Sequence, residues 1–266
     1  MGLWRRLAIG IAAVGAVGLA GGASGDPVRD GEPAHKPSTA DVLFWKLDQR
    51  DAGFRMLDEM SSLVEAHPVA AGGTVHPLPD GAPLVLDMDM DAYLAANRTA
   101  GLVVLQDGKV RLERYGLDFS ADGRWTSFSV AKSLTSTLVG AAIKDGAIKS
   151  LNDPVVDYIE ELRGSAYADV TVAQLLSMTS GIAWNEDYDD PHSDVAQFGS
   201  QRVEPGKSGV ATYMAKLPRA HAPGEVWNYS TGETSLIGIL VMRATGKPLV
   251  DYLSEKIWRS YGMQQD

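Results

Sequence analysis

The segment that most constrains this fold is residues 130–144, a predicted helix with apolar or small side chains on nearly every side. Gly146 follows it and suits the left-handed conformation that often ends a helix. A helix without a polar face has to be buried, so the chain needs a sizeable core. Its 266 residues, 45% of them hydrophobic, can form one, and this composition excludes a disordered chain.

The composition also excludes several functional classes. The absence of cysteine rules out a zinc finger, a thiol nucleophile and a disulfide framework. A net charge of −10 argues against nucleic-acid binding, which needs a basic face. The five histidines show no metal-binding spacing. We therefore expect no metal and no cofactor.

The N-terminus has the composition of a targeting segment. Arg5 and Arg6 precede an apolar run over 7–20, and small residues fill 21–25. The apolar run is shorter than the ~20 residues that span a bilayer, which favours a cleaved export signal over an uncleaved anchor. We expect residues 1–25 to direct the protein to the periplasm or the extracellular space, with membrane contact only through this segment.

The rest of the chain is predicted to be a flexible lead-in over 26–40 and one domain over 41–266. Residues 40–64 have helical apolar spacing, interrupted near Gly53, which indicates one or two amphipathic helices. Residues 101–105 and 110–115 flank Asp107-Gly108, a strong hairpin signal.

Helices dominate after the hairpin. Helix starts are indicated at Asp153-Pro154, at Thr171 with Gln174, and at Ser230 with Glu233, the last two as capping boxes. These helices should run to about 162, 178 and 245, and another is expected over 251–261. The order of elements predicts an α+β fold with a helical lobe.

One Ser-x-x-Lys motif, Ser129 to Lys132, stands at the start of the apolar helix. The pattern is common by chance, but here the serine N–H lies among the unpaired donors of a helix start, where it could stabilise an oxyanion. Lys132 lies one turn on, within reach of the hydroxyl. Burial beside Val130, Leu134 and Leu138 would favour a neutral amine that can accept the serine proton. The alternative is an ordinary solvated lysine.

Tyr229 lies in the loop just before the helix that Ser230 caps. A rigid loop end can hold a catalytic phenol that moves protons. The alternative is a buried tyrosine whose hydroxyl binds backbone, and spacing alone leaves both open.

Together, the segments 129–133 (Ser-Val-Ala-Lys-Ser) and 229–231 (Tyr-Ser-Thr) resemble the serine β-lactamase and penicillin-binding protein superfamily. The chain is most similar to class C-type esterases and 6-aminohexanoate-dimer hydrolases, from about Phe54 to its end. The resemblance implies a β-lactamase/transpeptidase-like fold, an antiparallel sheet with a helical lobe. It implies that Ser129 is acylated, Lys132 activates it and Tyr229 shuttles protons. The loop 185–191 resembles the one whose tyrosine closes over substrate in nylon-oligomer hydrolases, which makes Tyr188 the substrate-binding candidate.

The chain departs from the family pattern in three places. Thr231 replaces an asparagine, the tripeptide 245–247 is not the family's Lys-Thr-Gly strand, and the chain ends before the later strands of the sheet. We therefore expect a member truncated at the C-terminus, with turnover lowered or lost.

The predicted function is that of a serine hydrolase acting on a small-molecule amide or ester. A cell-wall D,D-peptidase or β-lactamase would use the same residues. A non-catalytic receptor or scaffold with the penicillin-recognising fold is the alternative from a different class.

Overall fold

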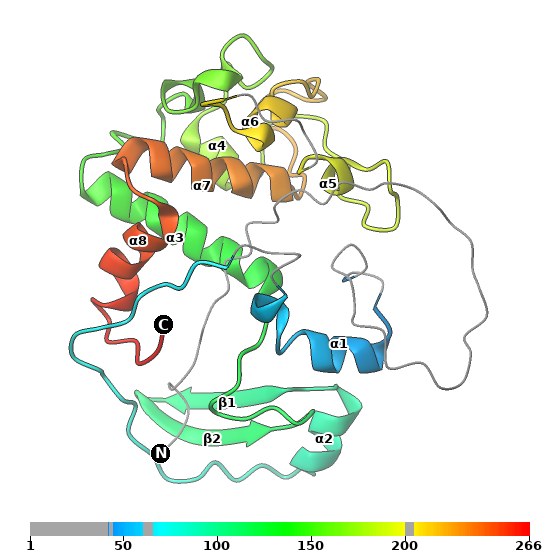
Figure 1. Ribbon diagram of the computed structural model, residues 1–266, viewed down its shortest axis with the longest axis vertical. Helices are drawn as coiled ribbons and strands as arrows, with labels where there is room; N and C mark the ends of the chain where they lie inside the picture. Colours follow the sequence, from blue (N-terminus) through cyan, green and yellow to red (C-terminus); the bar gives the residue numbers. More distant parts are fainter. Residues whose placement is uncertain (1–41, 43–44, 61–65, 200–204) are drawn as a thin grey trace.

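The computed structural model describes residues 42, 45–60, 66–199 and 205–266. The predicted export signal and lead-in lie outside these residues. A helical lobe lies above a small antiparallel sheet (Figure 1), which confirms the predicted α+β class. Within the described ranges, no helix combines the length and apolar character needed to cross a bilayer.

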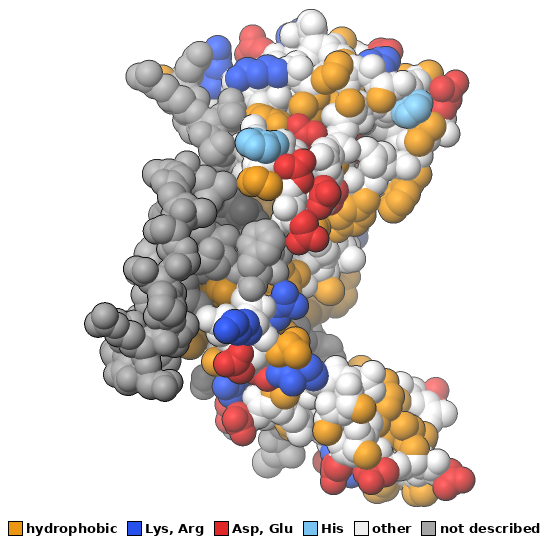
Figure 2. All heavy atoms as spheres, turned by 90° about the vertical axis from the view of Figure 1, so that its right-hand side faces the viewer, with side chains coloured by type: hydrophobic (Ala, Val, Ile, Leu, Met, Phe, Trp, Pro, Cys, Tyr) orange, Lys and Arg blue, Asp and Glu red, His pale blue; other side chains and the backbone are white. Residues whose placement is uncertain are grey.

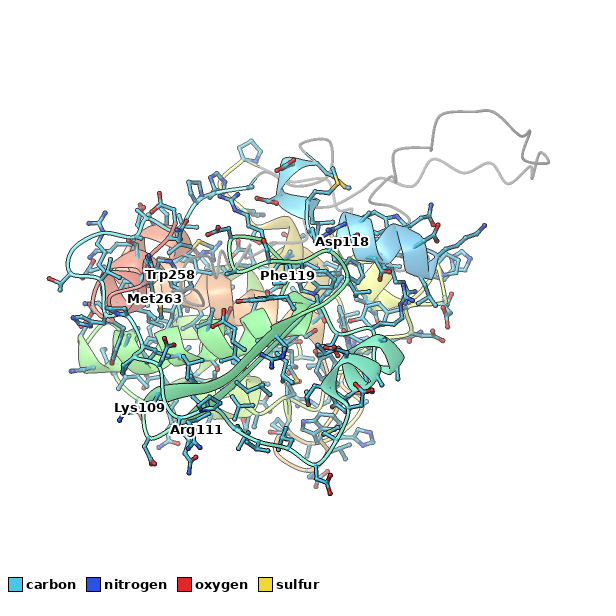
Figure 3. The ribbon with its side chains drawn as sticks, turned by 90° about the horizontal axis from the view of Figure 1, so that it is seen from below. Lys109, Arg111, Asp118, Phe119, Trp258 and Met263 are labelled. Atoms are coloured by element: carbon cyan, nitrogen blue, oxygen red, sulfur yellow. The ribbon has the colours of Figure 1, made fainter. Side chains whose placement is uncertain are left out.

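The sheet is the predicted hairpin, with β1 (Gly101–Gln106) antiparallel to β2 (Lys109–Tyr115). Asp107 and Gly108 have φ values of 54° and 72°, and a two-residue hairpin turn of the favoured type needs positive φ at both positions. Figure 3, seen from below, places Lys109 at the turn and Phe119 beyond the opposite end of the hairpin. The hairpin therefore leads the chain toward the aromatic side chains beneath the helical lobe.

Two long helices form the centre of the helical lobe. α3 (Ala131–Lys144) packs along α7 (Thr231–Thr245), and both contribute fully buried leucines such as Leu138 and Leu240. Gly146 has a φ of 76°, which confirms the predicted left-handed end of α3. The shorter helices are α1 (Leu47–Gly53), α2 (Met90–Ala96), α4 (Val172–Leu176), α5 (Asp194–Gln197), α6 (Gly209–Met214) and α8 (Leu249–Leu253). α4 and α6 both contact α7 (Figure 1), so the helix that follows Tyr229 has packed neighbours in addition to α3.

The capping predictions are confirmed at one helix and half confirmed at another. Thr171 and Gln174 form both bonds of a capping box at the start of α4. At α7, the Ser230 hydroxyl accepts from the Glu233 N–H at 3.1 Å, as predicted. The second bond of a capping box, from the Ser230 N–H to the Glu233 carboxylate, is not formed. The carboxylate accepts from Ser180 and Tyr167 in the core instead.

Elsewhere the chain forms shorter helical pieces than predicted. The helix expected over 153–162 is two 3₁₀ turns, Val155–Asp157 and Glu160–Leu162. They are separated by Ile159, whose backbone is extended at φ −121° and ψ 92°. The helix expected over 251–261 is divided between α8 and a π-helical turn, Ser254–Trp258.

The N-terminal prediction over 40–64 corresponds to α1 and a 3₁₀ turn, Leu57–Glu59, while residues 61–64 lie outside the described part.

Candidate active site

Ser129 lies in a 3₁₀ turn, Phe128–Val130, that leads directly into α3. Its side chain is exposed. This position agrees with the predicted helix start, but the Val130 and Ala131 N–H groups donate to the Ser127 and Phe128 carbonyls. The Ser129 hydroxyl is accessible to a substrate, and the Ser129 N–H, which has no acceptor among the described residues, is the donor that could stabilise an oxyanion.

An aromatic cluster holds the turn that carries Ser129. The Phe128 ring packs edge-on against Phe54 with centroids 4.9 Å apart, and Phe54 contacts Trp125 in the same way at 5.8 Å. Phe128 has a φ of 42°, and such a conformation is unfavourable for a bulky residue unless its surroundings fix it. The cluster provides this fixation, so the backbone immediately before Ser129 is held in a strained conformation.

Lys132 and Ser129 are in direct contact. The Lys132 Nζ lies 3.0 Å from the Ser129 Oγ, which is hydrogen-bond distance. The predicted burial of this lysine is only partly found: Leu138 is buried, but Lys132 itself is only half-buried and the Val130 side chain is 67% exposed. The pair nevertheless has the spacing that proton transfer from a serine nucleophile to a base requires.

Tyr229 lies beside the pair formed by Ser129 and Lys132. Lys132 Nζ lies 5.2 Å from the centroid of the Tyr229 ring. The loop is fixed on the N-terminal side by Asn228, whose N–H donates to the Met178 carbonyl at 3.0 Å. On the C-terminal side it is fixed by Ser230, the cap of α7. The described residues offer no hydrogen-bond partner to the Tyr229 hydroxyl, so the alternative of a tyrosine bonded to backbone is not what the structure contains.

Tyr188 joins this group through a residue that the sequence analysis missed. The Tyr188 hydroxyl donates to Glu186 Oε1 at 2.6 Å, and the Thr231 N–H donates to Glu186 Oε2 at 2.9 Å. Burial, followed by the hydrogen bond to Glu186, raises the pKa of Tyr188 to about 12, and the nearby Tyr229 contributes in the same direction. The spacing Trp184-x-Glu186-x-Tyr188 is the one available signal, because alternate residues of an extended segment share a side.

The surroundings of Ser129 are apolar at the rim and acidic on one side. The exposed hydrophobic residues are Phe128 (45%), Val130 (67%), Tyr188 (41%) and Trp227 (65%). The loop that carries Tyr188 is rich in aspartates, and Figure 2 shows acidic side chains gathered in the upper half of the face on which α5 lies. Such surroundings favour a substrate with an apolar body and disfavour an anionic one.

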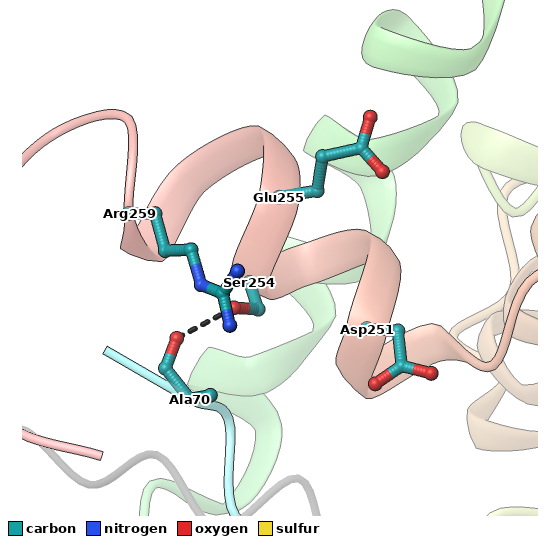
Figure 4. A pocket seen from close by; sticks show the side chains of 5 residues that line it. All are labelled: Ala70, Asp251, Ser254, Glu255 and Arg259. Carbon is teal, nitrogen blue, oxygen red and sulfur yellow. Dashed lines mark hydrogen bonds between the residues drawn. The ribbon is translucent and has the colours of Figure 1, made fainter. Parts of the chain in front are cut away.

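A separate hollow lies on the far side of the helical lobe. It is lined by Ala70, Asp251, Ser254, Glu255 and Arg259 (Figure 4). The Ser254 hydroxyl donates to the Ala70 carbonyl at 2.5 Å and ties the 66–71 segment to the π-helical turn. None of the four predicted site residues lines this hollow, so it is not part of the candidate active site.

The first turn of α7 carries a buried carboxylate. Glu233 is 3% exposed and accepts bonds from Ser180 and Tyr167, while its Oε2 has no partner among the described residues. Burial raises the pKa of Glu233 to about 7, despite the two hydrogen bonds that lower it. Glu233 therefore lies in the buried first turn of the helix that follows Tyr229, and not at the exposed surface of the site.

Comparison with known proteins gives a consistent family assignment. Residues 86–265 match the sequence profile of the family described as Beta-lactamase. The chain is 32% identical over 216 residues to the 6-aminohexanoate-dimer hydrolase of Paenarthrobacter ureafaciens, covering 77% of this chain and 55% of that protein. It is 25% identical over 189 residues to a Beta-lactamase of Pseudomonas fluorescens, covering 68% of this chain and 49% of that protein.

A solved structure from Bacillus anthracis, assigned as a 6-aminohexanoate-dimer hydrolase, superposes with a TM-score of 0.68 at 19% identity. The alignment covers 87% of this chain and 65% of that one, and it shows that the two share a fold. The chain spans about half the length of the curated relatives it matches.

Proposed function

Since the chain belongs to the beta-lactamase family of hydrolases, we propose that it cleaves amide or ester bonds through an acyl-serine intermediate. The observation that carries this proposal is the 3.0 Å contact between Lys132 Nζ and Ser129 Oγ, with Tyr229 beside the lysine. A serine hydroxyl is a weak nucleophile until a base accepts its proton. The lysine is positioned to be that base.

The reaction has two halves. Ser129 Oγ attacks the carbonyl carbon of the substrate while its proton moves to Lys132, and the Ser129 N–H stabilises the oxyanion. The bond to the leaving group then breaks as Tyr229 gives its proton to the departing amine or alkoxide and takes up the proton held by Lys132, which restores the neutral lysine. In the second half, water attacks the acyl-serine and gives a proton to Lys132. Lys132 passes this proton to Ser129 Oγ as the bond between the acyl carbon and Ser129 Oγ breaks, so that the carboxylic acid leaves and Ser129 is free again.

A linear amide with an apolar body is the substrate class that the surroundings support best. The 32% identity to a 6-aminohexanoate-dimer hydrolase favours that dimer as the first substrate to test. The exposed apolar rim and the acidic Tyr188 loop are compatible with an alkyl chain that carries an ammonium group. Similarity to a Beta-lactamase at 25% identity makes a chromogenic cephalosporin the second test. Turnover of the cephalosporin without turnover of the dimer would replace the proposed substrate class.

Tyr229→Phe is expected to affect amides much more than activated esters. An amine leaves only after it is protonated, whereas p-nitrophenolate leaves without a proton. We expect kcat to fall about 100-fold on the 6-aminohexanoate dimer and by less than about tenfold on a p-nitrophenyl ester. Both rates are measured at neutral pH for the wild-type chain and for Tyr261→Phe, a control at an exposed tyrosine remote from the site. An equal loss on both substrates would contradict the role of Tyr229 as proton donor.

A further inference from the structure

We infer that Glu186 is a positioning residue that fixes the Tyr188 loop to the first turn of α7 and thereby sets the position of Tyr188 relative to Tyr229. The inference rests on the proposed function, since it assigns Glu186 a role in substrate turnover. It follows from the hydrogen bonds of this carboxylate and from the elements that those bonds connect.

Glu186 accepts from four donors that lie on two separate segments. The Tyr188 hydroxyl and the Thr231 hydroxyl donate to Oε1, while the Trp184 indole N–H and the Thr231 N–H donate to Oε2. A carboxylate has about four acceptor positions on its two oxygens. All of them are used here, so the side chain has one well-defined position.

The two segments meet where the candidate site is built. Thr231 is the first residue of α7, a helix of 15 residues, and Tyr229 precedes it by two positions. A carboxylate at the start of a helix is stabilised by the helix dipole and by the unpaired N–H groups. This contact explains how Thr231 functions where the family pattern has asparagine: its N–H and hydroxyl both bind Glu186.

Packing reinforces the hydrogen bonds. The Trp184 ring contacts the Phe198 ring with centroids 5.6 Å apart, and Trp184 is only 9% exposed. A Cβ placed on Gly232 would lie 2.7 Å from the Trp184 ring, so the indole packs directly on the first turn of α7. Packing therefore fixes the position of the Trp184 side chain. Because Trp184 and the more exposed Tyr188 both donate to Glu186, the carboxylate links the position of Tyr188 to that of Trp184.

The loop itself supports this arrangement. The Asn185 and Asp187 side chains each accept from the N–H two residues further on, at 2.9 Å in both cases. Such turns hold short loops in one conformation. Hydrogen bonds within the loop therefore hold its conformation, and the bonds between Glu186 and Thr231 attach the loop to α7.

The test compares Glu186→Gln with Glu160→Gln, the same substitution at an exposed glutamate in the 3₁₀ turn Glu160–Leu162, outside the Tyr188 loop. Glutamine has the same length but accepts on one oxygen only, so two of the four donors lose their partner. We expect kcat/KM for the amide substrate, expressed per Ser129 titrated with a fluorophosphonate, to fall at least tenfold in Glu186→Gln and to change less than twofold in Glu160→Gln. Expressing the rate per titrated site removes any effect of misfolded protein.

A double variant tests whether Glu186 acts through Tyr188. If Glu186 acts in part through Tyr188, the losses in Glu186→Gln and Tyr188→Phe should not multiply in the double variant. The rate of Ser129 labelling by the fluorophosphonate should stay within about threefold of wild type, because fluoride leaves without a proton from Tyr229. Unchanged kcat/KM in Glu186→Gln, or fully multiplicative losses, would overturn the inference. Absence of labelling in the wild-type chain would instead contradict the proposed function.

Discussion

Lys132→Ala is expected to lower kcat for amide and ester substrates by about 10³-fold at neutral pH, because it removes the base that activates Ser129. A general base typically contributes 10²- to 10⁴-fold, and Lys132 is the side chain that contacts Ser129 Oγ. The fold should survive, since the lysine is partly exposed at the start of α3 and is not part of the buried core. Steady-state rates, with circular dichroism to verify folding, measure this effect.

Two further lysine variants sharpen that experiment. Lys132→Arg keeps a positive charge, but a guanidinium does not release its proton near neutral pH and cannot act as the base; we expect it to be as inactive as Lys132→Ala. Lys144→Ala, at the exposed opposite end of α3, should retain wild-type kcat. Activity within tenfold of wild type in Lys132→Ala would remove this residue from the mechanism.

The buried Glu233 is expected to make the protein less stable as the pH rises from about 4.5 to about 7. In the unfolded chain this glutamate titrates near its ordinary pKa of 4.5, whereas burial raises the folded pKa to about 7. Between these values the folded protein binds a proton that the unfolded chain has lost, so the free energy of unfolding decreases with pH. The contribution of Glu233 should change by about 3 kcal/mol across this window.

Glu233→Gln tests this contribution, because the amide has a similar shape and does not titrate. We expect the difference in unfolding free energy between variant and wild type, measured by urea denaturation, to move in favour of the variant by up to about 3 kcal/mol between pH 5 and pH 8. Glu161→Gln is the control with the opposite sign. The hydrogen bond from Arg243 lowers the pKa of Glu161 to about 2, so its contribution is lost as the pH falls below 4.5. A Glu233→Gln difference that does not vary between pH 5 and pH 8 would show that Glu233 is ionised in the folded protein.

The sequence-based predictions succeeded where structure is decided locally. The hairpin depends on Asp107-Gly108, and the start of α4 depends on Thr171 and Gln174, all within a few residues of the element they define. The prediction over 153–162 was wrong because the Asp153 carboxylate bonds to the Tyr158 hydroxyl at 2.5 Å, while Ile159 adopts an extended backbone. An α-helix and two 3₁₀ turns differ little in free energy over so short a segment, and the spacing of apolar residues does not distinguish them.

The candidate active site likewise combines local contacts, which the sequence predicts, with long-range contacts, which it does not. Ser129 and Lys132 are neighbours on one helical turn, so their contact could be predicted from spacing. The bond between Glu186 and Thr231 joins positions 45 residues apart, and nothing in either local sequence specifies it. Glu233 was assigned to a capping box by its position, but Ser180, 53 residues earlier, bonds to its carboxylate. Long-range polar contacts of this kind require the folded chain.

The central claim, that Ser129 is a nucleophile activated by Lys132, is tested most directly by covalent labelling followed by mass spectrometry of the intact protein. Incubation with an alkyl fluorophosphonate should add one phosphonyl group to each wild-type chain, located on the peptide that contains Ser129. Ser129→Ala should not be labelled, and Lys132→Ala should be labelled far more slowly. A wild-type chain that stays unlabelled, or a Ser129→Ala variant that is labelled as fast as wild type, would contradict the account.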